Sequence, residues 1–237
     1  MKRIVPLFIA LLLVSVSFAQ LERLSSIPEI DDFEPSFQPG AWVEYEVFDS
    51  EKEETSQMKF SVLSKEECED GDCFWFEFKV TEADGEWQIL KLKGADPREK
   101  ESLYSMIVQK KGEKPQQLDF MLPRNMPTLQ QEAEDEIEED EEVELDYTTE
   151  ENVEIKVKAG TFNTTHIVMK EEKGTSDIWI SEEVPMFGMV RAERGEEGYV
   201  ELINYGDKGA KSEIQGKTER IEIPNLQQLM QQGQEDQ

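Results

Sequence analysis

Histidine, cysteine and positive charge are all scarce in this chain. Its 237 residues include one histidine and two cysteines, and 25 basic side chains stand against 54 acidic ones, giving a formal net charge of −29. Zinc needs about four ligands, and the lone His166 lies far from both cysteines in the sequence, so we expect no metal centre. An acidic surface repels phosphate backbones and no basic stretch interrupts it, which argues against a nucleic-acid partner.

The chain also lacks an apolar run long enough to cross a membrane. Residues 4–16 are mostly apolar, but thirteen residues are too few to span a hydrocarbon core of roughly 30 Å as a helix. Two basic residues precede this run and the triplet Ser17-Phe18-Ala19 follows it, which is the pattern of a secretory signal peptide. We therefore predict cleavage after Ala19 and a mature chain that does not span a membrane. It should be exported to the periplasm or the cell exterior.

No motif of a known catalytic centre is present. We find no hydrolase elbow, phosphate loop or zinc signature, and a single histidine without a nearby nucleophile defines no catalytic unit. In residues 132–146 eleven of fifteen side chains are acidic, but this run lacks the ordered spacing and central glycine of a calcium loop. The sequence therefore favours a protein that is not an enzyme and carries no cofactor.

The two cysteines lie close together and flank a turn signal. Cys68 and Cys73 are separated by four residues that include Asp70-Gly71, a dipeptide typical of tight turns between strands. In an oxidising compartment this spacing favours a disulfide over a redox or metal role. Because the closed loop is small, its entropic stabilisation should be limited to roughly 2 to 3 kcal/mol.

Alternation of apolar and polar residues recurs along most of the chain. The clearest example is residues 74–80, where Phe74, Phe76 and Phe78 alternate with polar or amphipathic side chains. The Asp84-Gly85 turn precedes a further alternating segment, and we assign residues 103–110 to a strand in preference to a short helix. Nine or ten such strands without βαβ alternation predict a mainly β fold with little helix. The expected form is a single strongly curved antiparallel sheet or a partly open barrel.

Composition divides the chain into four parts. We predict a signal peptide at residues 1–19, an extended leader at 20–40, an antiparallel β domain at 41–215 and a tail at 216–237. The β domain should contain a disordered acidic insertion at about residues 130–150, because like charges repel one another and keep the segment solvated. Asn225, after Pro224, could cap a short helix in the tail.

The most distinctive residues lie in the second half of the chain. They are Ala159-Gly160-Thr161-Phe162, His166-Ile167, Trp179-Ile180-Ser181 and residues 184–190. This pattern resembles exported bacterial proteins of uncharacterised function, which we place near the LolA/LolB-like lipoprotein-carrier superfamily. The resemblance covers about 40 residues and implies a half-barrel whose concave apolar face holds acyl chains. The acidic insertion departs from that family, and no acyl-binding residue of the carriers can be matched to a position here.

A curved sheet can enclose an apolar lumen when its inward-facing side chains do not fill it. The candidate lumen residues are Phe60, Phe74, Phe76, Phe78, Trp87, Phe162, His166 and Phe187. The alternative is that these aromatic residues pack the core, since alternation reveals a buried face but not whether it is hollow. His166 would contact a ligand head group in the first case and be a core or rim histidine with a backbone partner in the second.

Two main functions are compatible with these features. The first is an exported, non-enzymatic binding or carrier protein for a lipid, a lipoprotein acyl chain or another apolar ligand. The second is an interaction or scaffold module that contacts another envelope protein through its outer strand faces, acidic insertion and glutamine-rich tail. A hydrolase that uses scattered carboxylates is a third and weaker alternative, because no pair of carboxylates is singled out by the sequence.

Overall fold

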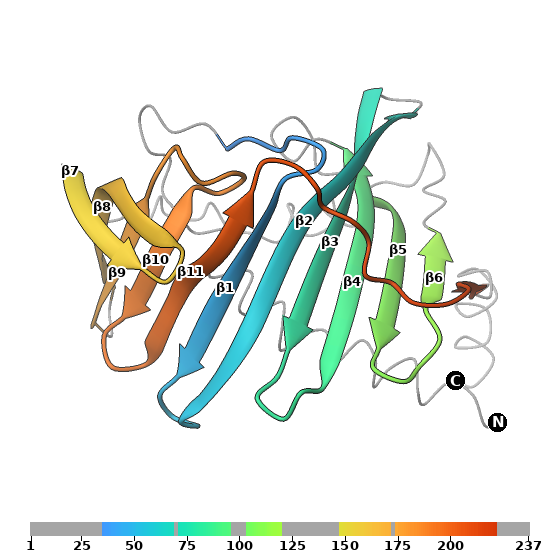
Figure 1. The fold of residues 1–237 in the computed structure, drawn as a ribbon, viewed down its shortest axis with the longest axis horizontal. Coiled ribbons are helices and arrows are strands. Elements are labelled where there is room, and N and C mark those ends of the chain that lie inside the picture. The colour runs from blue at the N-terminus through green and yellow to red at the C-terminus, as the bar shows by residue number, and fades with distance from the viewer. Residues whose placement is uncertain (1–34, 69–70, 96–102, 120–146, 172–173, 222–237) are drawn as a thin grey trace, which may run out of the picture. The chain divides into compact units, whose positions relative to one another are not determined.

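The computed structural model describes residues 35–68, 71–95, 103–119, 147–171 and 174–221, and these form one twelve-stranded sheet without helices. The strands are β1 (Trp42–Asp49), β2 (Glu54–Cys68), β3 (Gly71–Thr81), β4 (Trp87–Ala95), β5 (Leu103–Lys110), β6 (Gln116–Asp119), β7 (Tyr147–Val157), β8 (Gly160–Glu171), β9 (Gly174–Ile180), β10 (Met189–Arg194), β11 (Gly198–Gly206) and β12 (Glu219–Arg220) (Figure 1). Accordingly, no helix in the described part of the chain could span a membrane.

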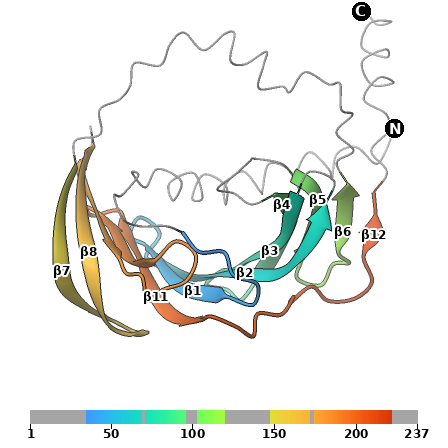
Figure 2. The same cartoon turned by 90° about the horizontal axis from the view of Figure 1, so that it is seen from above.

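The sheet joins two meanders through one long-range pairing. Its strand order is β12-β6-β5-β4-β3-β2-β1-β11-β10-β9-β8-β7, so that β1 and β11 lie side by side and connect the two halves (Figure 1). All neighbouring strands are antiparallel except β12 and β6, which are parallel. The sheet is strongly curved and does not close (Figure 2). These features confirm the predicted fold class.

Cross-strand register assigns each strand residue to one of two faces, because directly opposed residues in an antiparallel pair lie on the same side. One row of opposed residues is apolar and marks the concave face, here called the inner face; it consists of Val43, Phe60, Phe78, Leu90 and Val108. The row beside it marks the convex or outer face and consists of Glu44, Lys59, Lys79, Ile89 and Gln109. Buried side chains lie on both faces: Val43 and Val62 are fully buried on the inner side, and Ile89 in the outer row is 1% exposed.

The outer face of the first meander is crossed by residues 207–221, which we call the C-terminal strap (Figure 2). The backbone N–H of Glu213 donates to Glu77 Oε1 over 2.7 Å, and the backbone N–H of Gln215 donates to Gln109 Oε1 over 2.7 Å. The strap ends in β12, where the Glu219 backbone N–H donates to the carbonyl of Pro115. Polar side chains of the outer face thus hold a segment that has almost no regular structure of its own.

Two glycine positions are fixed by the turns that they serve. Gly85, with φ of 81°, closes the β3–β4 hairpin and donates its N–H to the Glu82 carbonyl. A Cβ on Gly198 would lie 2.0 Å from the carbonyl oxygen of Phe48, so only glycine fits where β11 begins beside β1.

Most sequence-based strand assignments coincide with observed strands. The predicted disulfide is confirmed, with Cys68 and Cys73 Sγ atoms 2.09 Å apart, and residues 103–110 form β5. Strands β6 and β12 were not predicted, and the described residues form twelve strands where nine or ten were expected. The signal peptide, residues 20–34 of the leader, residues 130–146 of the predicted acidic insertion and the expected helix after Pro224 lie outside the described residues. The last residues of that predicted insertion, 147–150, are not disordered but belong to β7.

Candidate apolar binding face

Six phenylalanines gather on the inner side of the sheet, and we call them the phenylalanine cluster. They are Phe37, Phe60, Phe74, Phe76, Phe78 and Phe187. Phe60 on β2 opposes Phe78 on β3, and their ring centroids are 4.5 Å apart. Phe74 and Phe76 follow on the same face of β3, with ring centroids 5.9 Å apart. The alternation of β3 therefore places three rings in a row, and the register adds the fourth.

The remaining two rings come from segments that precede β1 and β10. Phe187 lies 5.7 Å from Phe60, and Phe37 lies 5.8 Å from Phe76, each in an edge-to-face arrangement. Phe37 and Phe187 also contact each other, with centroids 5.7 Å apart. Edge-to-face pairs of this kind stabilise aromatic contacts by about 0.5 to 1.5 kcal/mol beyond the burial of their area. Two chain segments far apart in sequence thus meet over the inner face.

The cluster is buried unevenly. Phe74 and Phe78 are 4% and 8% exposed, which is typical of core residues. The other four rings, those of Phe37, Phe60, Phe76 and Phe187, are only half-buried. Each half-buried ring retains apolar surface in contact with water, and covering that surface would contribute about 25 cal/mol per Å². The cluster therefore combines a packed base with an accessible apolar layer.

Two polar side chains of the described residues lie beside the cluster, and both have partners within the protein. Tyr45, fully buried beside this core, donates its hydroxyl to the carbonyl of Met189 over 3.0 Å. Burial raises the pKa of Tyr45 far above its ordinary value, so the phenol stays neutral. Lys65 lies near the cluster, with its Nζ 5.7 Å from the Phe74 ring centroid and 2.5 Å from Asp72 Oδ2. Across the described residues, no three histidine, cysteine or carboxylate side chains are grouped to hold a metal ion.

The structure brings together five of the eight predicted lumen residues, namely Phe60, Phe74, Phe76, Phe78 and Phe187. It places Trp87 on the opposite face, because Trp87 opposes Thr81 and lies beneath Lys79 Nζ at 5.6 Å. Phe162 is buried against Tyr205, with ring centroids 5.7 Å apart. Sequence alternation alone did not separate these two aromatics from the cluster.

His166 also lies away from the cluster. It opposes Trp179 on β9 and stacks on that ring at 4.5 Å, with the two planes 4° apart. Its Nε2 lies 2.8 Å from Asp177 Oδ1, so its partner is a carboxylate and not the expected backbone group. Trp179 in turn opposes Arg191, and this row belongs to the outer face. The contacts of His166 with described residues therefore lie on the outer face.

Sequence analysis missed Phe37. This residue lies in the leader, where no periodicity marks it, and it joins the cluster because Ser36 pairs with Met186 in an isolated antiparallel bridge. The Pro39-Gly40 pair that follows is a turn signal just before β1, and Gly40 has a φ of 98°. The sequence signal that could have indicated Phe37 was therefore this turn, because a sharp turn before β1 can place the preceding residues over the sheet.

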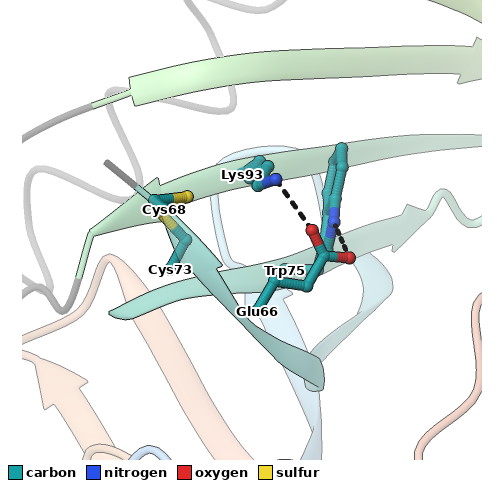
Figure 3. The surroundings of a disulfide bond; sticks show 5 residues. All are labelled: Glu66, Cys68, Cys73, Trp75 and Lys93. Atoms are coloured by element: carbon teal, nitrogen blue, oxygen red, sulfur yellow. Dashed lines mark hydrogen bonds and ion pairs between the residues drawn. A yellow bond between two sulfur atoms is a disulfide. The ribbon is translucent and has the colours of Figure 1, made fainter. Parts of the chain in front are cut away.

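The outer face carries all four tryptophans of the chain, and three of them lie beside lysines. Lys59 Nζ is 5.2 Å from the Trp42 ring centroid, and Lys91 Nζ is 4.9 Å from that of Trp75. Trp75 also donates its Nε1–H to Glu66 Oε1 over 3.0 Å, and Lys93 lies 2.7 Å from the other oxygen of Glu66, next to the disulfide (Figure 3). The hydrogen bond from Lys93 lowers the pKa of Glu66.

Comparison with known proteins gives only distant structural likenesses. No family model and no curated protein matches this chain. Among solved structures, a candidate lipoprotein of Parabacteroides distasonis superimposes with a TM-score of 0.34 at 13% identity, covering 73% of this chain and 97% of its own. A candidate exported protein of Bacteroides fragilis with a YmcC-like fold gives 0.33 at 13% identity, covering 73% and 98%. At such TM-scores nothing about function is transferred from either protein.

Proposed function

We propose that this chain is an exported, non-enzymatic binding protein whose inner face takes an apolar ligand of the lipid or acyl-chain type. The observation that carries the proposal is the phenylalanine cluster, in which Phe37, Phe60, Phe76 and Phe187 are half-buried on the concave side of an open sheet. Export rests on the signal-peptide pattern at residues 1–19. The predicted LolA/LolB-like resemblance implies the same kind of ligand but is not needed for the physical argument.

Chemistry favours a hydrocarbon over a polar ligand at this face. The rings contact one another and present carbon and aromatic hydrogen, so they can bury a chain but cannot orient one by hydrogen bonds. Lys65, beside Phe74, is the charged group nearest to these rings among the contacts described above. The proposed ligand is therefore recognised by its apolar portion, and its head group contributes less to affinity.

The proposal is tested by purification of the exported protein without detergent, followed by native mass spectrometry and organic extraction. Stoichiometric lipid in the extract would support it. If the protein is empty, we would titrate it with a fluorescent fatty acid whose emission rises in an apolar environment. A clean mass without bound lipid, together with no probe binding, would overturn the proposal and favour the envelope scaffold instead.

Neighbouring residues on one strand provide a matched pair of variants. Phe76→Ala removes a ring from the inner face, whereas Trp75→Ala removes a larger ring from the outer face of the same strand. Probe affinity should fall about tenfold or more for Phe76→Ala, since truncation of a buried aromatic contact costs about 1.4 kcal/mol or more. It should stay near the wild-type value for Trp75→Ala. Equal losses in both variants would point to a general loss of folding, which a thermal melt of each variant would reveal.

A further inference from the structure

We infer that Phe37 is a built-in competitor for the inner face, held there by the bridge between Ser36 and Met186, and that a ligand must displace it. This inference rests on the proposed function. Phe37 contacts Phe76 and Phe187 edge to face, at centroid distances of 5.8 and 5.7 Å. It therefore occupies, with an aromatic side chain of the protein itself, the layer of half-buried rings that an apolar ligand would use.

The arm that carries Phe37, residues 35–39, has one firm end. At this end the backbone N–H of Gly40 donates to the Val62 carbonyl over 2.6 Å, and that of Val62 donates to the Ala41 carbonyl over 2.9 Å. The Gly40 carbonyl also accepts from the backbone N–H of Ala210 over 2.9 Å. The chain is thus fixed to β2 and to the strap immediately after the arm, and Gly40, with φ of 98°, provides the sharp turn between them.

The other end of the arm includes an isolated β-bridge. Ser36 and Met186 exchange two backbone hydrogen bonds, 3.2 Å from Ser36 N to Met186 O and 3.0 Å from Met186 N to Ser36 O. These two residues form an isolated bridge and not a strand. Met186 is itself 2% exposed, and its loop is held to the end of β9 by the hydrogen bond from Ser181 N–H to the Gly188 carbonyl. Displacement of Phe37 requires that the Ser36–Met186 bridge breaks and that the ring leaves Phe76 and Phe187.

A competitor of this kind lowers the apparent affinity of the site. Ligand binds only to the fraction of molecules in which the arm has moved, so the apparent Kd equals the intrinsic Kd divided by that fraction. An open state populated at about 10% or less would weaken apparent binding about tenfold or more. Removal of the Phe37 ring should therefore tighten binding, whereas removal of Phe76, which lies beneath the ring, should weaken it.

The first test compares Phe37→Ala with Phe76→Ala, using the fluorescent fatty acid as probe and the full exported chain. We expect an affinity about tenfold higher for Phe37→Ala and lower for Phe76→Ala, relative to wild type. A lower affinity in both variants would overturn the inference, because Phe37 would then be a wall of the site and not its competitor. Thermal melts of both variants establish that each comparison is made on folded protein.

The second test locks the arm with the double variant Ser36→Cys and Met186→Cys. Residues that exchange both hydrogen bonds in an antiparallel pair have Cα atoms about 5.5 Å apart, within the range of a disulfide. The oxidised variant should bind the probe at least tenfold more weakly than the reduced one. Wild-type protein under the same reductant controls for loss of Cys68–Cys73, and Met186→Cys alone controls for the altered core.

The pattern of outcomes separates the two proposals. Equal probe affinity in the oxidised and reduced double variant would overturn the competitor role while leaving the binding function intact. If the probe binds to none of the three proteins (wild type, Phe37→Ala and the reduced double variant), the binding function is overturned, and the competitor role with it. Tighter probe binding in Phe37→Ala, together with weaker binding in the oxidised double variant, supports both the binding function and the competitor role.

Discussion

On the inner face of β2 and β3 the aromatic side chains are phenylalanines that contact one another, whereas the aromatic side chain on the outer face of β3 is a tryptophan that lies beside lysines. Phe76 and Trp75 are neighbours in sequence and illustrate the contrast, since one packs on Phe37 and Phe74 and the other on Lys91 and Glu66. The tryptophan indole N–H needs a hydrogen-bond acceptor, and the large indole ring can bind an ammonium group on its face. A phenylalanine ring has no polar group and is stabilised by exclusion from water.

The outer face therefore satisfies its polar groups within the chain, and the strap contributes to this. Glu77 is 4% exposed and accepts hydrogen bonds from the Ser212 hydroxyl and the Glu213 backbone, while the Glu213 side chain bridges Lys59 and Lys79. On the inner face, the ion pair described beside the phenylalanine cluster is the one between Lys65 and Asp72. The inner face, whose half-buried rings lack such polar contacts among the described residues, is therefore the face suited to an apolar ligand.

The largest effect on stability should follow from truncation of a buried side chain on the inner side of β11. Leu202 is fully buried opposite Tyr45, so Leu202→Ala should lower the free energy of unfolding by about 2 to 5 kcal/mol through lost burial and the cavity left behind. Asn204→Ala, an exposed position on the same strand, should change it by less than about 0.5 kcal/mol. Urea unfolding of both variants measures the difference, and a loss below about 1 kcal/mol for Leu202→Ala would contradict the assignment of this core.

A smaller and more local effect is expected on the outer face. Glu77→Ala removes the acceptor of the Glu213 backbone N–H and of the Ser212 hydroxyl, and a buried donor without its partner costs about 1 to 3 kcal/mol. Hydrogen exchange should therefore accelerate in the strap at residues 212–215 more than in β8. Glu77→Gln keeps one acceptor oxygen and should retain part of the protection. Unchanged exchange at Glu213 in Glu77→Ala would show that the strap is held by other contacts.

The difference between the two faces also explains what the sequence could and could not predict. Alternation in β3 and the Asp84-Gly85 turn encode the hairpin locally, so Phe74, Phe76 and Phe78 were correctly grouped on one face. The same turn pairs Thr81 with Trp87, and this register, which a hydrophobicity pattern does not contain, sends Trp87 to the outer face. Cys68 and Cys73 were paired from their spacing alone.

The elements that were missed depend on contacts between distant parts of the chain. Strand β12 has two residues, both polar, and exists because the strap returns to β6 and hydrogen-bonds to Pro115 and Gln117. Phe37 likewise joins the cluster through the bridge to Met186, about 150 residues later in the sequence. Neither segment has an amphipathic pattern, so local sequence carries no record of where its partner lies.

The smallest effect concerns the ionic contacts that hold the strap, and it depends on pH. Partial burial raises the pKa of Glu213, but hydrogen bonds and attraction from Lys79 and Lys59 outweigh it, so the net pKa lies below the usual 4.5. A carboxylate whose pKa is lowered by folding contributes stability above its unfolded pKa and loses it as pH falls through the folded value. Wild-type stability should therefore decrease below about pH 4.5, in part through this residue.

Glu213→Gln should remove that part of the dependence. At pH 7 we expect the free energy of unfolding to fall by about 1 kcal/mol or less, since Glu213 and its lysine partners are about one-third exposed and screened by solvent. The difference in stability from wild type should shrink between pH 5 and pH 3. Urea unfolding at a series of pH values gives both curves. Lys79→Gln should act in the same direction, and the double variant should lose less than the sum of the single losses because the two side chains share one contact. A gap that stays constant down to pH 3 would mean that Glu213 affects stability through packing and not through its charge.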